Sequence, residues 1–295
     1  MTLQTLINDY VKKKDAAFGV YVKHLETGEE ASISGDRLFQ MASVFKIPIL
    51  AALFEKVYNG EINLHDRVML LEEDYVPGSG IFQELDYGIQ PTIKDLATLM
   101  IIVSDNLATD RILKLIGGPS YVQERMRELG FGSINLQHTC WELLSLSAGI
   151  DSSNYSKELF ETIINRLVAG KYDWDSIVFQ EREDNNTSTP RGMCKLLEAI
   201  ADGKFISREC SQSILNILFK QHYQQRIPGK LPKNKKVANK TGSLGTMFND
   251  AAIVYLPNGT RYVMTVYSIG SSLDYQGDEP IADISLIAYN YFMKK

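Results

Sequence analysis

The chain has 295 residues, enough for one large folding unit or two interlocked ones around a hydrophobic core. Hydrophobic residues make up 44% and charged residues 23%, and the 21 glycines and 9 prolines are too few for a fibrous or low-complexity protein. The 31 basic and 36 acidic residues give a net charge of −5 without a block of like charge, so we expect no nucleic-acid partner.

The predicted elements begin with a β-hairpin. Apolar and β-branched residues run from Phe18 to Leu25 and from Glu30 to Ser34, and Gly28 between them suits a tight turn. The middle of the chain changes to the apolar spacing of helices. Helices are predicted at Ile47–Tyr58, Ile93–Val103, Leu107–Ile116, Tyr121–Leu129, Lys157–Val168, Arg191–Ala201 and Arg208–Phe219.

Strands near both ends of the chain predict one sheet assembled from the two termini, because a single hairpin is marginal without partner strands. The later strands are predicted at Lys236–Thr241, Ala251–Tyr255 and Arg261–Ser268, followed by a helix at Ile281–Met293. The fold class is therefore α/β (α+β), with an antiparallel sheet, flanking terminal helices and a largely helical lobe. We place the α/β lobe at residues 1–35 and 222–295, the helical lobe at 36–221, and the active site between them.

The sequence predicts neither a metal site nor a membrane segment. Three scattered cysteines and four scattered histidines fit neither a disulfide framework nor metal-ligand spacing. The longest apolar stretch, Ile47–Phe54, is too short to span a bilayer. Residues Met1–Asp15 mix polar and charged side chains and do not resemble an export signal, so we expect a cytoplasmic protein, or a periplasmic or secreted one if residues precede this sequence.

A first short motif contains a serine and a lysine, which could act as the nucleophile and the base in the transfer of an acyl group to serine. Ser43 stands at the predicted start of an apolar helix, and Lys46 follows one turn later on the same face. An amine can take a serine proton when burial or a second cation lowers its pKa. Ser-x-x-Lys alone is expected about once by chance in a chain of this length, so by itself it carries no assignment.

Two further motifs complete the pattern. Ser104-Asp105-Asn106 falls between two predicted helices, where the ordinary interpretation is a helix N-cap and turn. Lys240-Thr241-Gly242-Ser243 ends a predicted strand, where glycine allows close backbone approach and lysine can hold a carboxylate. The three motifs in this order and setting are expected by chance in roughly one chain in a few hundred.

Together the motifs resemble those of the class A β-lactamases and penicillin-binding enzymes, and the order of strands and helices is similar across nearly the whole chain. The resemblance implies that Ser43 is the acylated nucleophile and Lys46 its base or proton relay. It also implies that Ser104 passes the proton to the departing amine.

The same resemblance implies a set of substrate-binding residues. Asn106 would hydrogen-bond the amide side chain of the substrate, while Lys240 and Thr241 would bind its carboxylate and tune the catalytic hydroxyl. The backbone N–H groups of Ser43 and Ser243 would form the oxyanion hole. No metal or organic cofactor is implied.

Trp141-Glu142 resembles the Ω-loop of class A enzymes and makes Glu142 the candidate base for deacylation. Two departures stand out. Leu146 occupies the place of an asparagine that helps to hold water, and the stretch 143–189, which leads to Thr189-Pro190, is longer than usual. Glu142 could instead be a solvated charge ahead of a surface helix at Tyr155–Val168. Three acidic residues later in the chain could replace Glu142 as the base, but they are more typical of a solvated loop: Glu181, Glu183 and Asp184.

The resemblance implies a serine hydrolase that opens β-lactams through an acyl-serine intermediate. Two alternatives stay open: a D-amino-acid peptidase or small-ester hydrolase, and a covalent β-lactam binder with poor turnover. Each takes a small-molecule substrate, and the sequence does not predict the oligomeric state. The Gly-rich stretch Tyr75–Phe82 is either a wall of the cleft or a surface turn pinned by Phe82.

Overall fold

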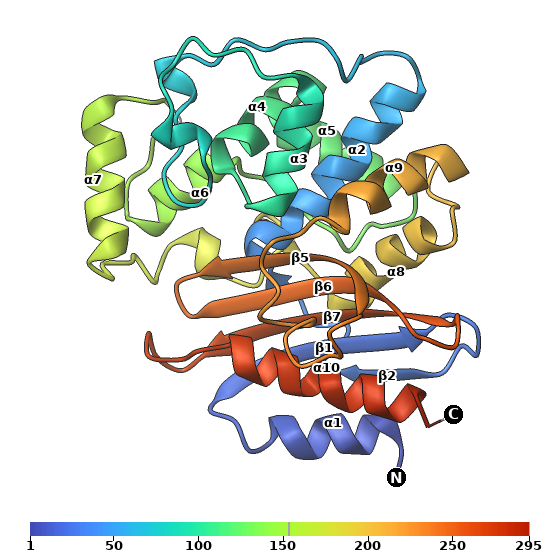
Figure 1. Ribbon diagram of the computed structural model, residues 1–295. Helices are drawn as coiled ribbons and strands as arrows, with labels where there is room; N and C mark the ends of the chain where they lie inside the picture. Colours follow the sequence, from blue (N-terminus) through green and yellow to red (C-terminus); the bar gives the residue numbers. More distant parts are fainter. Residues whose placement is uncertain (153, 295) are drawn as a thin grey trace.

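Strands from both ends of the chain pair in one antiparallel sheet, as the sequence predicts. The computed structural model describes residues 1–152 and 154–294, and its five-stranded sheet has the order β2-β1-β7-β6-β5 (Figure 1). The pairing is antiparallel throughout, and the hairpin β1–β2 joins the C-terminal strands through β7. The five strands are β1 (Ala16–His24), β2 (Glu30–Ile33), β5 (Lys236–Leu244), β6 (Met247–Tyr255) and β7 (Arg261–Gly270).

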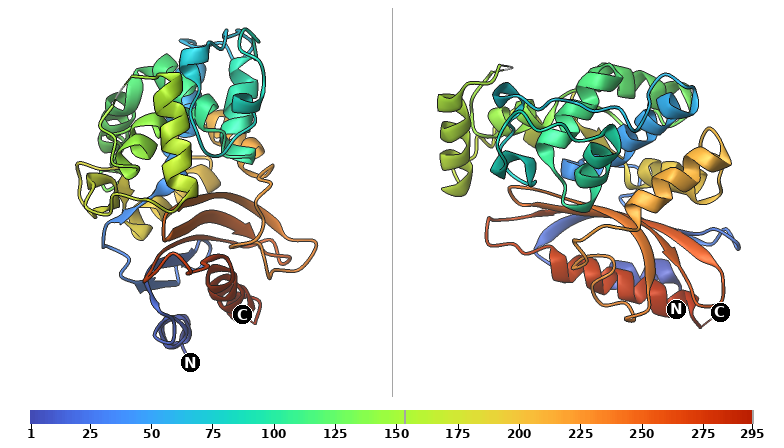
Figure 2. Two further views of the ribbon diagram at one scale, coloured as in Figure 1. Left: turned by 90° about the vertical axis from the view of Figure 1, so that its left-hand side faces the viewer. Right: turned by 45° about the horizontal axis from the view of Figure 1, so that its top comes forward.

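Helices cover both faces of this sheet. On one face lie α1 (Leu3–Val11) and α10 (Asp278–Phe292), which contact each other (Figure 2). On the other face α8 (Pro190–Ala201) lies against β1 and β7 beneath the remaining helices. These are α2 (Lys46–Tyr58), α3 (Ile93–Ile102), α4 (Asn106–Ile116), α5 (Gly118–Glu128), α6 (Cys140–Ser147), α7 (Lys157–Val168) and α9 (Arg208–Leu218).

Two elements were missed because their signals were assigned to other roles. The N-terminal residues form the amphipathic helix α1, capped by Thr2, where the sequence analysis predicts no element. Thr139 and Glu142 form the capping box that starts α6, a pattern visible in the sequence. A short second sheet, β3 (Phe39–Gln40) with β4 (Thr187–Ser188), carries no periodicity long enough to predict.

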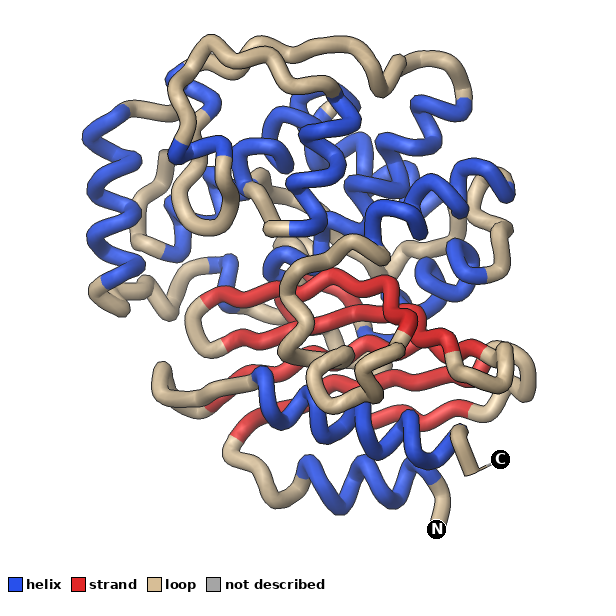
Figure 3. Tube along the Cα trace, in the orientation of Figure 1, coloured by secondary structure: helices blue, strands red, loops and turns tan. Residues whose placement is uncertain are grey.

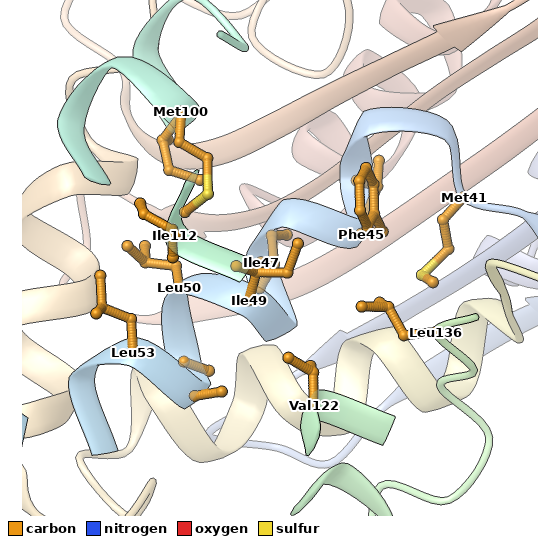
Figure 4. Close-up of a cluster of buried hydrophobic side chains, with 14 of the residues drawn as sticks. Met41, Phe45, Ile47, Ile49, Leu50, Leu53, Met100, Ile112, Val122 and Leu136 are labelled. Carbon is orange, nitrogen blue, oxygen red and sulfur yellow. The ribbon is translucent and has the colours of Figure 1, made fainter. Parts of the chain in front are cut away.

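The helix α2 is the centre of the hydrophobic core between the sheet and the helices. Residues from Lys46 to Glu55 are all buried, because α2 is apolar on every side and is surrounded by other helices (Figure 4). A second core lies between the other sheet face and α1 and α10. Within residues 1–152 and 154–294, no helix combines the length and the apolar character needed to cross a membrane. The central position of α2 fixes the short 3₁₀ turn η1 (Ala42–Phe45) against the sheet edge.

The strands from the two chain ends form the sheet, and most helices from the middle of the chain lie on one side of it (Figures 1 and 3). The assignment of residues 1–35 and 222–295 to one lobe and 36–221 to the other stays a prediction. One feature crosses that division, since α8 belongs to the predicted helical lobe but packs directly on the sheet.

Candidate active site

A cavity of about 390 Å³ lies where β5 meets η1 and the helices. Residues from all three sequence motifs reach it, although the motifs are separated by many residues along the chain. Those that line it are Ser43, Ser104, Asn106, Thr241, Gly242 and Ser243. The cavity therefore joins the parts of the chain that the resemblance assigned to chemistry.

Ser43 lies on η1, one turn before the buried Lys46. Ser43 is half-buried, whereas its neighbours Ala42 and Val44 are buried. Ala42 has a φ of 44°, a left-handed backbone that a non-glycine residue adopts at a cost, and such strain is common next to reactive groups. On the opposite side Gly242 approaches so closely that a Cβ there would lie 2.7 Å from the Ser43 amide nitrogen. Strand β5 is thus held directly against the turn that carries Ser43.

Ser104 lies between two lysines. Its Oγ is 3.1 Å from Lys46 Nζ and 3.1 Å from Lys240 Nζ. Lys46 Nζ also donates to the Ser104 carbonyl at 2.7 Å and to Asn106 Oδ1 at 2.7 Å, and Lys240 Nζ donates to the Thr241 carbonyl at 2.6 Å. A hydroxyl has two acceptor sites and one proton, so two amine donors leave the Ser104 proton free to be donated into the cavity.

Both lysines are fully buried, and burial disfavours their charged forms. Burial lowers the pKa of Lys46. Burial, and next the nearby positive charge of Lys46, hold the pKa of Lys240 well below its usual value. A buried carboxyl, Asp250, lies close enough to oppose this effect, and its own pKa is raised to about 6 by burial. The site therefore holds amines that can lose a proton more readily than exposed lysines.

The middle motif forms the helix N-cap that is its ordinary interpretation, and its Ser104 and Asn106 line the cavity. Asp105 caps α4 by accepting from the Ala108 N–H, which is the ordinary interpretation of this tripeptide. The same carboxylate accepts the N–H groups of Ile81 and Phe82. Asn106 accepts from Lys46, and its amide nitrogen donates to a backbone carbonyl at 2.8 Å. The turn is therefore held rigidly while its functional groups face the cavity.

The Gly-rich stretch Tyr75–Phe82 is both a cleft wall and a turn pinned in the core. Gly78 and Ser79 line the cavity, and Ser79 Oγ donates to the Ser104 carbonyl at 2.9 Å. Phe82 is buried at the other end of the stretch. The stretch is therefore a wall of the cleft at one end and a turn pinned by Phe82 at the other.

Arg226 is a site residue that no sequence pattern marks. It is buried under β5, where it donates to the carbonyls of Gly242 and Asn249, each at 2.6 Å, and to Ser243 Oγ. Its Nε donates to Asp278 at 2.8 Å. Because these partners are 16 to 52 residues away, only the folded chain brings them together. Arg226 supplies a fixed positive charge at the end of the cavity where Thr241 and Ser243 lie.

The structure does not bring Glu142 to this cavity. One of its carboxylate oxygens accepts the Thr139 N–H at 2.8 Å, and the side chain lines a separate cavity of about 280 Å³ on the other side of α6. The residues of α6 that face the catalytic cavity are Cys140, Leu143 and Leu144. The role of Glu142 as deacylation base thus stays a prediction that the observed geometry does not support.

A half-buried carboxylate fixes this orientation of α6. Asp110, on α4, accepts the N–H groups of Cys140 at 2.7 Å and Trp141 at 2.9 Å. Leu146, which stands where the resemblance leads us to expect an asparagine, is half-buried and packs on the core. The late acidic residues lie outside the cavity as well, since Glu181 pairs with Arg37 and Asp184 with Arg182. In the part of the chain that the structure describes, no three metal-binding side chains come together.

Three comparisons show which known proteins this chain is similar to. The family model described as the β-lactamase enzyme family matches residues 2–292. The chain is 27% identical to β-lactamase VEB-1 of Pseudomonas aeruginosa over 98% of this chain and 90% of that protein. The solved acyl-enzyme complex of a PBP-A mutant with penicillin G is 26% identical, with a TM-score of 0.77 over 99% of this chain and 97% of that one. TLA-3 extended-spectrum β-lactamase, at 21% identity, a TM-score of 0.81 and 98% coverage of both chains, shares the fold.

Proposed function

This chain belongs to the β-lactamase enzyme family, and we propose that it opens the amide bond of β-lactams by transferring their acyl group to Ser43. The resemblance predicted from the three motifs is confirmed, and the chain is a hydrolase of the serine β-lactamase type. One observation carries the assignment of roles. Ser104 Oγ, 3.1 Å from both buried lysine amines, lines the same cavity as Ser43.

Acylation begins with the neutral form of Lys46, which burial favours. Lys46 Nζ takes the proton of Ser43 while the Ser43 oxygen bonds to the lactam carbonyl carbon. The C–N bond of the ring then breaks, and Ser104 donates its proton to the departing nitrogen. Lys46 returns the proton it took to Ser104, across the contact of 3.1 Å between them. The products are a Ser43 ester and a neutral amine, so no proton is gained or lost.

Two backbone donors would stabilise the oxyanion of this step. They are the N–H groups of Ser43 and Ser243, which belong to η1 and β5, and Gly242 keeps these elements in contact. One such donor is worth about 3 kcal/mol of transition-state stabilisation in other enzymes. The glycine matters because any larger side chain would meet the backbone of η1.

The charge of the cavity selects an anionic substrate. Arg226 and the hydroxyls of Thr241 and Ser243 line the cavity together, where they would bind the carboxylate of a β-lactam, and Lys240 is buried behind Thr241. Asn106 lies toward the other end with Leu143 and Leu144, where the acylamino side chain would lie. A substrate bound in this way presents its carbonyl to Ser43.

Hydrolysis of the ester needs a base that can activate water. Of the described residues that line the cavity, Asp278 alone carries a carboxylate, and it is engaged by Arg226. The α6 residues that line the cavity are Cys140, Leu143 and Leu144, and none of them carries a carboxylate. This arrangement favours a second candidate function, a covalent β-lactam binder with slow release. A D-amino-acid peptidase or small-ester hydrolase would use the same acylation residues.

Time-resolved intact-mass measurement with penicillin G separates these functions. Because the lactam is cyclic, acylation should increase the mass of the protein by one whole penicillin molecule. A transient adduct with released product supports the hydrolase, and a persistent adduct supports the slow binder. Ser43→Ala is the matched control and should give no adduct. If the native chain gave neither an adduct nor hydrolysed product, both would be refuted, and esters and D-Ala-D-Ala peptides would then be the substrates to assay.

A further inference from the structure

The catalytic cavity continues into a second, shallower cavity of about 640 Å³. The two share Gln225 and Asp278, so they are neighbours at the end of the cleft where Arg226 lies. The second cavity is bounded by the segment 222–230, which follows α9 and crosses the sheet toward α10, and by the first turns of α10 (Figures 1 and 3). We call this second cavity the distal groove.

The walls of the distal groove are firmly attached to the fold. Lys230 Nζ donates to Glu279 at 3.1 Å and to Asp283 at 2.5 Å, which ties the segment to α10. The Ile227 N–H donates to the buried carboxylate of Asp250 at 3.0 Å, which ties the same segment to β6. A segment held at both places keeps its shape without a bound molecule, so the groove is preformed.

The direction of the groove indicates which part of a substrate would enter it. In the function proposed above, the substrate carboxylate lies beside Arg226 and Thr241, and the acylamino side chain lies at the opposite end. The ring that bears the carboxylate is therefore the part nearest the groove. A substituent on that ring, next to the carboxylate, would pass Asp278 and lie along the first turn of α10.

The charges around the groove favour a positive substituent. Asp278 and Glu279 are exposed at 47% and 75% of their side chains. Among the described residues that line the groove, Lys230 carries the one amine, and it is already shared between Glu279 and Asp283. When a substrate carboxylate engages Arg226, the attraction of that guanidinium for Asp278 is divided between two anions. The groove is then left with an excess of negative charge that a cation would compensate.

We infer that the distal groove is a subsite for the leaving-group side of the substrate and that it prefers a cationic over a neutral substituent there. This inference rests on the proposed acylation of Ser43 and deepens it. It names β-lactams with a positively charged group on the carboxylate-bearing ring as the preferred substrate class. Penicillins, whose ring carries only two methyl groups, would not reach the groove.

The test uses two cephalosporins that share one acylamino side chain. One carries a neutral acetoxymethyl group on the dihydrothiazine ring and the other a cationic pyridiniomethyl group. We expect the native chain to be acylated faster by the cationic compound. Glu279→Lys should lower the ratio of the two acylation rates about three- to tenfold, because it changes the local charge by two units near the surface. Added salt should reduce the difference, since salt screens exposed charges.

The controls separate the outcomes. Glu124→Lys makes the same charge reversal on α5, at a side chain that is 62% exposed and far from the groove, and should leave the ratio unchanged. Acylation by penicillin G should be unchanged in Glu279→Lys, and melting curves establish that both variants are folded. If Glu279→Lys is destabilised, Glu279→Gln makes a milder change in the same direction. An unchanged ratio while both compounds acylate normally overturns the subsite, whereas no acylation by any lactam overturns the proposed function itself.

Discussion

Gly242→Ala tests the contact on which the proposed oxyanion hole depends. A Cβ at this position would lie 2.7 Å from the Ser43 nitrogen, 2.8 Å from the Val44 nitrogen and 2.7 Å from the Met41 carbonyl. All three are backbone atoms of the turn that bears the nucleophile, so none can rotate away. Ordinary contacts begin at about 3.4 Å, and β5 and η1 must therefore separate by about 0.7 Å, the difference between 3.4 and 2.7 Å.

The magnitude of the effect follows from this displacement. Overpacking of this kind costs about 1–3 kcal/mol of stability, so the melting temperature should fall by a few degrees while the chain still folds. A misplacement close to 1 Å at a reacting centre lowers rates by up to about 10²-fold. We expect the acylation of Ser43 by penicillin G to slow by about 10- to 100-fold.

The assay is the rate of adduct formation followed by intact mass, together with a thermal melt. Gly132→Ala is the matched control, because the nearest atom to a Cβ there is 4.0 Å away and the residue is exposed. It should change neither quantity measurably. If Gly242→Ala kept the native melting temperature and acylation rate, the close approach of β5 to η1 would have no role in the chemistry.

Four further outcomes are expected. Ser104→Ala should slow acylation by about 10²- to 10⁴-fold without preventing folding, since it removes the proposed proton donor to the leaving nitrogen; a normal rate would exclude that role. Glu142→Gln should leave the release of the acyl group within about twofold of native, because its carboxylate faces away from the cavity, and a long-lived adduct would restore it as the base. The acylation rate should fall about tenfold per pH unit below the pKa of Lys46, which lies under its usual value, and a flat profile would refute its role as base. Asp250 has its folded pKa raised to about 6, so its contribution to the free energy of unfolding should decrease as pH rises from about 4 to 6. Denaturant melts should show this slope reduced in Asp250→Asn.

Local patterns were sufficient for most of the fold. The pairing of strands from both ends followed from alternating apolar residues and from the need of a hairpin for partners. The capping box of Thr92 and Asp95 starts α3 where the sequence placed it. The same reasoning applied to Thr139 and Glu142 would have predicted the start of α6.

By itself, then, the sequence determined which residue types the site contains and which elements carry them. Only the tertiary structure decided how those side chains face one another. Glu142 faces away from the cleft because Asp110, from a different helix, holds the first N–H groups of α6. Arg226 enters the site because carbonyls of β5 and β6 converge on its guanidinium. Such contacts join residues far apart in the chain, and a pattern that spans one or two helical turns contains no information about them.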